Sequence, residues 1–308
     1  MKKYLILFIS LTTFLGFSQA TTYTEDELSV SKWIDGTLLT PNDIEKPNLA
    51  IIIAGSGPTN RNGNQNFLKN NSLKKLAEGL TNNGIATFRY DKRVVKQILH
   101  NNIDKNMMFD DFITDASDVL DYFKEKNNYN KIYVIGHSQG SLVGMVSAKD
   151  KADGFISLAG AGNNIGDVLI EQIDKTAPMF SEDTKRIVTS LKEGKTTTDF
   201  PIALASVFNA EIQPFMMNWM SYNPTEIIKD LDMPILIING TKDLQVSEKE
   251  AEVLNAANEK SQLVIIENMN HVLFEIEGGD LENSKSYNES FRAISPQLII
   301  SITNFIEP

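Results

Sequence analysis

The feature that most constrains the fold of this chain is the stretch K-I-Y-V-I-G-H-S-Q-G at residues 131–140. Residues 132–135 form an apolar run rich in β-branched side chains, which predicts a strand buried on both faces at the centre of a parallel sheet. G-x-S-x-G follows at once, and residues 141–149 predict a helix. This pattern between a strand and a helix is typical of a sharp turn that lifts a reactive serine above the sheet, so Ser138 is our candidate nucleophile.

The two glycines of this motif have a steric role. In so tight a turn the serine adopts a strained backbone conformation, and neighbours without side chains, Gly136 and Gly140, relieve the crowding. The same five-residue pattern also occurs by chance in ordinary turns. The strand before it and the helix after it favour a nucleophile over a structural turn.

Apolar runs alternate with helical patterns along most of the chain. The buried runs lie at residues 49–54, 85–90, 132–135, 154–158, 234–239 and 263–266. Helices are predicted at residues 72–82, 110–126, 141–149, 247–258 and from 295 onward. Strands that alternate with helices through short connections predict a mostly parallel sheet with helices on both faces.

Three segments of the chain are predicted not to follow this pattern. Residues 28–34 and 37–40, with Gly36 as the turn between them, predict an antiparallel hairpin at the edge of the sheet. Residues 91–93, D-K-R, are predicted to form a charged loop after a strand, and residues 275–289 a polar loop.

The strand pattern stops in residues 163–230, where helical patterns predict a cap inserted above the sheet. The core domain then consists of residues 21–162 and 231–308. The cap contains an apolar group of side chains, which either line a substrate pocket or form the cap's own core. These are Phe215, Met216, Met217, Trp219 and Met220.

Residues 1–20 predict a secretory signal peptide. Lys2 and Lys3 precede an apolar run at residues 5–17, and small residues stand before the expected cleavage after Ala20. The alternative is a membrane anchor, but an apolar run of about 13 residues is too short to span a bilayer. We therefore expect a periplasmic or secreted protein with no stable membrane insertion after cleavage.

Composition excludes several classes of protein. The 308 residues are 42% hydrophobic, enough for a sizeable core, and contain no cysteine, which excludes disulfides, a cysteine nucleophile and cysteine-bound metals. There is no H-E-x-x-H motif and no cluster of histidines with carboxylates, so we expect no metal site. A net charge of −11 argues against nucleic acid and anionic membranes as partners.

A serine nucleophile needs a base, and the base needs an acid that holds its tautomer. The expected order along the chain is serine, acid, histidine. His271 is the only histidine after the helix that follows Ser138, so it is the candidate base, the alternative being a surface loop histidine. His100 lies in a polar segment and is predicted to be solvated. The ring of His137, directly beside the serine, projects in the wrong direction for a base.

The acid is expected after the strand at residues 234–239, and Asp243 follows it through a short turn. The alternative is that Asp243 is an ordinary turn aspartate. Glu248 is the nearest substitute, although the first turn of a helix favours a carboxylate in any case. Asp230 and Asp232 precede the strand, at the wrong end of the sheet.

Two backbone N–H groups are expected to bind the oxyanion of a tetrahedral intermediate. One belongs to Gln139, the residue after the nucleophile. The other belongs to the glycine-rich loop after residues 49–54, where Ser56 is best placed and Gly57 is next. That loop could also be a plain turn or a phosphate cradle, but a dinucleotide fingerprint needs a helix at once, and residues 58–71 intervene.

Six motifs carry a resemblance to a known family. They are A-G-S-G-P-T-N-R-N-G-N (54–64), R-Y-D-K-R (89–93), G-H-S-Q-G (136–140), A-G-A-G (159–162), N-G-T-K-D-L-Q-V (239–246) and N-M-N-H-V-L (268–273). On these motifs, which span nearly all of the chain after residue 20, the protein resembles the α/β-hydrolase superfamily. More narrowly, it resembles the secreted bacterial esterases and serine aminopeptidase-like hydrolases.

The resemblance implies an α/β-hydrolase fold with a helical cap and no cofactor. It implies that Ser138 is the nucleophile, Asp243 the acid and His271 the base, with the amides of Ser56 and Gln139 as the oxyanion hole. One departure concerns the turn after R-Y-D-K-R, where the family often has a glycine and this chain has two valines at residues 94–95.

Three functions are compatible with the sequence. The first is an exported serine carboxylesterase that acts on small-molecule esters through an acyl-enzyme, with an apolar cap that favours short to medium acyl chains. The second is a peptidase or amidase on the same triad, since both reactions use the same residues. The third is a catalytically silent binding protein, against which the complete triad argues. The sequence does not predict an oligomeric state.

Overall fold

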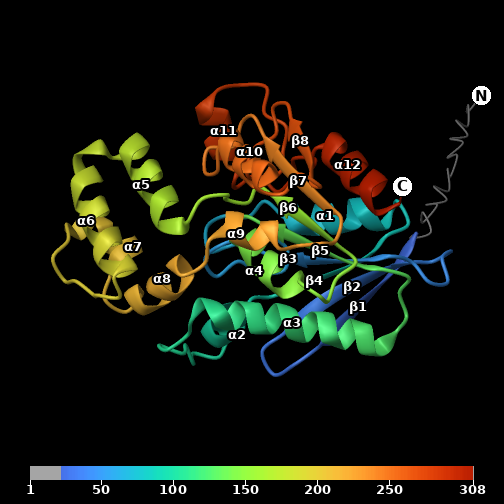
Figure 1. Ribbon diagram of the computed structural model, residues 1–308. Coiled ribbons are helices and arrows are strands. Elements are labelled where there is room, and N and C mark those ends of the chain that lie inside the picture. Colours follow the sequence, from blue (N-terminus) through green and yellow to red (C-terminus); the bar gives the residue numbers. More distant parts are fainter. Residues whose placement is uncertain (1–21, 308) are drawn as a thin grey trace, which may run out of the picture.

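The computed structural model describes residues 22–307 and contains one mixed sheet that runs through the molecule (Figure 1). The predicted signal peptide, residues 1–20, lies outside the described residues. The strands are β1 (Tyr23–Ser29), β2 (Asp35–Pro41), β3 (Leu49–Ile53), β4 (Ala86–Tyr90), β5 (Ile132–His137), β6 (Gly154–Leu158), β7 (Ile235–Gly240) and β8 (Gln262–Ile266). Their spatial order is β1-β2-β4-β3-β5-β6-β7-β8. β2 pairs antiparallel with β1 and with β4, and all other neighbours are parallel.

Helices connect most of these strands. They are α1 (Ser72–Thr81), α2 (Arg93–Leu99), α3 (Phe109–Lys126), α4 (Gln139–Ala148), α5 (Ile165–Thr176), α6 (Ser181–Lys192), α7 (Ala205–Phe208), α8 (Gln213–Met220), α9 (Pro224–Lys229), α10 (Glu248–Ala257), α11 (Asp280–Ser286) and α12 (Pro296–Ile306). Two short 3₁₀ turns lie at Pro178–Phe180 and Ile202–Leu204. Within residues 22–307, none of these helices is both long and apolar enough to cross a membrane.

The strand before the candidate nucleophile, β5, is buried on both faces. Ile132 and Val134 belong to the apolar layer that contains side chains of α3 and α4. Tyr133 and Ile135 belong to the opposite layer, which contains side chains of α1 and α12. This alternation follows the two-residue period of a strand. The prediction of a mostly parallel sheet with helices on both faces is confirmed.

The edge hairpin forms, but at a different register from the predicted one. β1 ends at Ser29, and the turn is closed by a 2.9 Å hydrogen bond from the Val30 N–H to the Ile34 carbonyl. Gly36 lies inside β2, opposite Leu28, and is not the turn. The apolar alternation continues through the turn residues, so the pattern could not show where the strand ends.

Two of the predicted loops contain helices. Residues 91–93 do not form a solvated charged loop, because α2 begins at Arg93, and Lys92 and Arg93 are buried. Residues 275–289 contain α11. The valines at residues 94–95 continue α2, so a helix stands where the resemblance implies a glycine-containing turn.

Helices α5 to α9 lie between β6 and β7 in the chain. Figure 1 shows α5, α6, α7 and α8 together at one side of the sheet. Their apolar side chains, among them Ile187 and Phe208, form a cluster of their own. Trp219 of α8 extends this cluster to α3, where it stacks on Phe109 with ring centroids 5.5 Å apart.

Candidate active site

Ser138 occupies the turn between β5 and α4 in the strained conformation expected from the motif. Its φ and ψ are 55° and −122°, a region that residues other than glycine rarely adopt. A Cβ at Gly136 would lie 2.2 Å from the Gly140 carbonyl oxygen, and a Cβ at Gly140 would lie 2.4 Å from the Ile53 carbonyl oxygen. Side chains at these positions would force the turn apart, so the serine requires glycine on both sides.

His271 and Asp243 lie in the loops after β8 and β7 and contact each other. His271 Nδ1 donates to Asp243 Oδ2 at 2.7 Å, and the two side chains are 5% and 1% exposed. Asp243 Oδ1 accepts the backbone N–H groups of Gln245 and Val246 at 2.8 and 2.9 Å. Three donors therefore orient the carboxylate, which keeps the proton of a neutral His271 on Nδ1 and leaves Nε2 free to accept one.

Ser138 and His271 line the same small cavity, of about 70 Å³. Within the described residues, no hydrogen bond joins the Ser138 hydroxyl to the His271 ring. Catalytic hydrogen bonds are often long in proteins without substrate and tighten only in the complex. The structure thus brings Asp243 and His271 into contact and places His271 and Ser138 around one cavity.

The loops that carry these two residues are joined by α11. Asn270 Nδ2 donates to Asn283 Oδ1 at 2.9 Å, and to a serine hydroxyl of the same helix at 2.8 Å. Asn283 Nδ2 donates in turn to the Lys242 carbonyl at 2.6 Å. Because Lys242 precedes Asp243 and Asn270 precedes His271, Asn283 fixes the two loops relative to each other.

His137 supports the loop of the candidate base and is itself buried. Its Nε2 lies 2.8 Å from the backbone carbonyl oxygen of His271, so Nε2 carries the proton and donates it. Burial, together with the neighbouring His271, lowers the pKa of His137 to about 4. The ring is therefore neutral near pH 7 and acts as a structural donor. His100 is exposed at the end of α2.

The two candidate oxyanion amides lie beside Ser138. Ser56 follows β3, borders both cavities that Ser138 borders, and its N–H donates to no described residue. Gln139 is the first residue of α4, where a backbone N–H has no acceptor within the helix. A Cβ at Gly55 would lie 3.2 Å from the Ser138 Cβ, so the loop before Ser56 passes close to the nucleophile.

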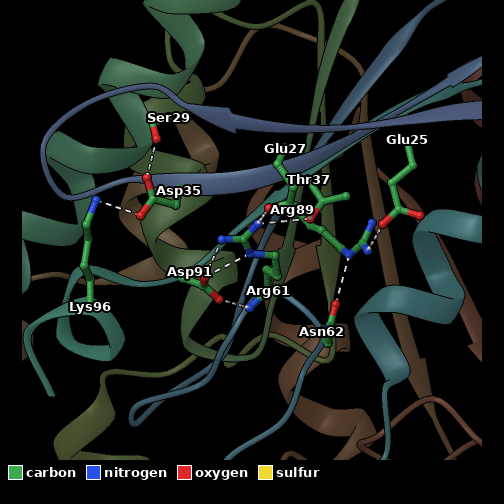
Figure 2. Close-up of polar contacts among 10 residues, drawn as sticks. All are labelled: Glu25, Glu27, Ser29, Asp35, Thr37, Arg61, Asn62, Arg89, Asp91 and Lys96. Atoms are coloured by element: carbon green, nitrogen blue, oxygen red, sulfur yellow. Dashed lines mark hydrogen bonds and ion pairs between the residues drawn. The ribbon is translucent and has the colours of Figure 1, made fainter. Parts of the chain in front are cut away.

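A charged cluster fixes the other end of this glycine-rich loop, as Figure 2 shows. Arg61 donates its backbone N–H to Asp91 Oδ1 at 2.7 Å, and its Nε and Nη2 to Asp91 Oδ2 at 2.9 and 2.6 Å. Its Nη1 also pairs with Glu27 of β1. Arg89 Nε donates to Asn62 Oδ1 at 3.3 Å. Two neighbouring residues of the loop are thus held on the sheet.

A larger cavity, of about 330 Å³, borders Ser138 on the side of the cap. Its apolar lining comes mostly from α4 and from the cap and includes Leu142, Ile165, Val168, Leu169, Val207, Ile212, Met216 and Trp219. Of the cap residues that the sequence left open between pocket and core, Met216 and Trp219 line this cavity. Phe215, Met217 and Met220 pack in the cap cluster and do not.

The sequence did not indicate that Glu250 of α10, which is 4% exposed, supports the site. Its carboxylate accepts the backbone N–H groups of Gly162 and Asn163, both at 2.8 Å, and Asn163 Nδ2 at 2.8 Å. It therefore holds the segment that leads from β6 into the cap. Glutamate is ordinary in the first turn of a helix, so no signal in the sequence marked this one. Glu248, the alternative acid, makes no hydrogen bond to His271.

Comparison with known proteins shows similarity to a family model over part of the chain and to a characterised sequence relative. Residues 70–200 match the model of a family described as serine aminopeptidase, S33. The chain is 26% identical over 239 residues to esterase EstD of Thermotoga maritima. The match covers 74% of this chain but only 55% of that esterase, so the chain spans about half the length of this relative.

Solved structures share the fold at low sequence identity. Est1E from Butyrivibrio proteoclasticus has a TM-score of 0.55 and 17% identity, over 85% of this chain and 96% of its own. An esterase of Pyrococcus furiosus has a TM-score of 0.53 and 14% identity, over 92% of this chain and 90% of its own. Sheet topology, motif order and these likenesses agree, and the chain has the α/β-hydrolase fold that its motifs indicated.

Proposed function

We propose that this protein is a serine hydrolase that cleaves carboxylic esters through an acyl-enzyme. The proposal rests on the 2.7 Å hydrogen bond between His271 and Asp243, beside a strained Ser138 that borders the same cavity as His271. A histidine held in one tautomer by a buried carboxylate, next to a serine on a sharp turn, can activate a hydroxyl. Ser138 is then the nucleophile, His271 the base and Asp243 the acid that orients it.

The reaction proceeds in two acyl transfers. His271 Nε2 takes the proton of the Ser138 hydroxyl as Oγ bonds to the ester carbonyl carbon, and the N–H groups of Ser56 and Gln139 stabilise the oxyanion. The bond to the alcohol oxygen then breaks, and the alcohol leaves with the proton from His271. Water attacks the acyl-enzyme with His271 again as base, which releases the acid and restores Ser138.

The two cavities that border Ser138 support a binding position for each part of the ester. Because His271 must protonate the leaving oxygen, the alcohol leaves on the side of the small cavity, which His271 borders. That cavity is lined mainly by polar residues, among them Thr59, Gln65, Asn70 and Tyr287. The acyl group occupies the larger apolar cavity under the cap. The substrates are therefore esters of short to medium apolar acids with compact, polar alcohols.

The linings of the cavities also favour esters over the peptide substrates of an aminopeptidase. An aminopeptidase has to bind the charged amino group of its substrate, for which a carboxylate is the usual partner. Among the described residues that line the two cavities there is no aspartate or glutamate. A neutral ester needs no such partner, whereas a free amino terminus would lose its hydration without compensation.

Hydrolysis of p-nitrophenyl acetate and butyrate, beside a panel of aminoacyl-anilides, tests the proposal. We expect the wild type to cleave the esters and Ser138→Ala to be slower by a factor on the order of 10³ or more. Ser147→Ala, at the far end of α4, is the matched control and should keep the wild-type rate. A fluorophosphonate probe should label the wild type and not Ser138→Ala.

Three results would contradict this function. Equal ester rates for wild type and Ser138→Ala would exclude Ser138 as the nucleophile. Faster cleavage of anilides than of esters would establish the peptidase alternative. Absence of both hydrolysis and labelling in the wild type would point to a catalytically silent binding protein.

We also propose that the protein is exported to the periplasm or the medium. The support is the pattern of Lys2 and Lys3, an apolar run and small residues before the expected cleavage after Ala20. N-terminal sequencing of the protein recovered outside the cytoplasm of a bacterial host should begin at Thr21. Recovery of an uncleaved chain in the cytoplasm alone would contradict export.

A further inference from the structure

A buried lysine lies behind the two backbone amides of the oxyanion hole. Lys92, between β4 and α2, is 5% exposed. Its Nζ donates to the Gly55 carbonyl oxygen at 3.0 Å and to Gln139 Oε1 at 2.7 Å. The Phe112 ring centroid lies 4.1 Å from Nζ. These contacts account for the three N–H groups of the ammonium, two on oxygens and one on the aromatic face.

Lys92 lacks the carboxylate partner that usually compensates a buried cation. The charged residues on either side of it are paired elsewhere, Asp91 with Arg61 and Arg93 with Asp115. No ion pair involves Lys92 in the part of the chain that the structure describes. Burial therefore lowers the pKa of Lys92 to about 7. Both oxygen contacts persist in the neutral form, because an amine retains two N–H groups.

The contact with Gly55 determines the direction of the Ser56 N–H. The Gly55 carbonyl and the Ser56 N–H belong to one peptide group, and in a planar trans peptide they point in opposite directions. Because Lys92 binds the carbonyl on one side, the N–H points to the other, where Ser56 and Ser138 border both cavities. A positive donor on the carbonyl also polarises the peptide and strengthens its N–H as a donor.

The contact with Gln139 joins the same ammonium to the residue that supplies the second donor. Gln139 presents its backbone N–H at the start of α4 and its side-chain oxygen to Lys92. We propose that Lys92 is a positioning residue of the oxyanion hole, holding the peptide between Gly55 and Ser56 against Gln139 so that both N–H groups bind one oxygen. This inference rests on the proposed serine hydrolase function.

The variant Lys92→Met tests the proposal, since it keeps the apolar stem over Phe112 and removes both hydrogen bonds. For p-nitrophenyl acetate we expect kcat to fall about 10- to 100-fold, somewhat less than the loss of a whole oxyanion donor, with KM within about twofold. Labelling of Ser138 by a fluorophosphonate, whose phosphoryl oxygen occupies the same hole, should slow by the same factor. A lysine with only a structural role would lower stability without this split between kcat and KM.

Lys75→Met is the matched control. Lys75 Nζ also donates to two carbonyl oxygens, of Asn70 at 2.9 Å and Ser290 at 2.5 Å, and lies 5.1 Å from the Phe274 ring centroid. It borders neither cavity, so this variant should keep kcat within about twofold of the wild type. An equal loss of kcat in Lys75→Met and Lys92→Met would overturn the proposal.

Further outcomes test whether Lys92 positions the oxyanion hole. A folded Lys92→Met with wild-type kcat, or with a raised KM and unchanged kcat, overturns the positioning role. If Lys92→Met does not fold, Gln139→Leu replaces it, because it removes one of the two bonds and keeps the backbone N–H. A fall in kcat of about threefold or more then supports the proposal, and wild-type kcat overturns it. A wild type that neither hydrolyses esters nor takes the label would instead contradict the proposed function.

Discussion

Asn283 donates from Nδ2 to the backbone carbonyl of Lys242 at 2.6 Å and accepts from Asn270 at 2.9 Å through Oδ1. One side chain, 1% exposed, thus joins the loops after β7 and β8. Each of the two contacted residues directly precedes a member of the proposed acid–base pair, Asp243 and His271. The 2.7 Å bond within that pair therefore depends on an amide outside it.

Replacing this amide should weaken both folding and activity. We expect Asn283→Leu to lower the free energy of unfolding by about 1–3 kcal/mol, because it removes the buried amide that donates to the half-buried Lys242 carbonyl and accepts from Asn270. The value of kcat should fall more than KM changes, since the acid–base pair loses its alignment. Urea denaturation and ester kinetics measure the two effects. Ser284→Ala, on the exposed side of the same helix, should shift stability by less than about 0.5 kcal/mol. Wild-type values for Asn283→Leu would disprove the joining role.

The variant Asp243→Asn tests whether Asp243, and not another carboxylate nearby, is the acid that orients His271. The amide is neutral and can present a donor to His271 Nδ1, which disfavours the tautomer that accepts a proton at Nε2. We expect kcat for p-nitrophenyl butyrate to fall about 10³- to 10⁴-fold with the fold intact. Glu248→Gln, at the start of α10, should stay within about twofold of the wild type. A larger loss in Glu248→Gln than in Asp243→Asn would reassign the acid.

The serine turn should not tolerate a methyl group at Gly140. A Cβ there would lie 2.4 Å from the Ile53 carbonyl oxygen and 2.7 Å from the Ala54 carbonyl oxygen, and these backbone atoms cannot move aside as a flexible side chain can. We predict that Gly140→Ala lowers the free energy of unfolding by about 2 kcal/mol or more and abolishes ester hydrolysis. Gly279→Ala, where a Cβ meets nothing within 4 Å, is the control and should remain active. Thermal unfolding and activity of the two variants, measured together, check this, and a stable, active Gly140→Ala would refute it.

Stability should fall on acidification because His137 is buried. Its pKa is lowered from 6.5 to about 4 by burial, so between these values the unfolded chain binds more protons than the folded one. The contribution of His137 is complete above about pH 6.5 and is lost as the pH falls toward 4, a change of about 3 kcal/mol. Urea denaturation across this range should show a flatter profile for His137→Gln than for wild type. The exposed control His100→Gln should keep the wild-type slope, and identical slopes in all three proteins would exclude His137.

Regular elements could be predicted where periodicity is strong. The strand at residues 154–158 coincides with β6, and the predicted helix at residues 110–126 differs from α3 by one residue at its start. The helix α11 gave no such signal. Its one apolar residue, Leu281, is 71% exposed, and its buried side is formed by polar residues, Asn283 and Ser286. A helix that packs through hydrogen bonds has no apolar period to detect.

Candidate site residues could be proposed from the sequence where the chemistry requires a fixed order of residues along the fold. The serine turn, with an aspartate and a histidine after later strands, predicted Ser138, Asp243 and His271 as candidates, and the structure brings Asp243 and His271 into contact beside the cavity that Ser138 borders. Lys92 and Glu250 could not be identified in this way. Charged residues after a strand or in the first turn of a helix are ordinarily solvated, and only tertiary packing shows that these two are buried.

The apolar cluster of the cap is distinct from the layers on the two faces of the sheet, and α8 joins it to one of them, the layer of α3 and α4, through the stacked pair Trp219 and Phe109. The residues that shape the larger cavity therefore lie mostly outside the packing that orients Ser138 and His271. In the proposed function, selection of the acid and cleavage of the ester bond are therefore carried by different parts of the chain. Substitutions in the cap can therefore change which acid is preferred without altering the residues proposed to break the ester bond.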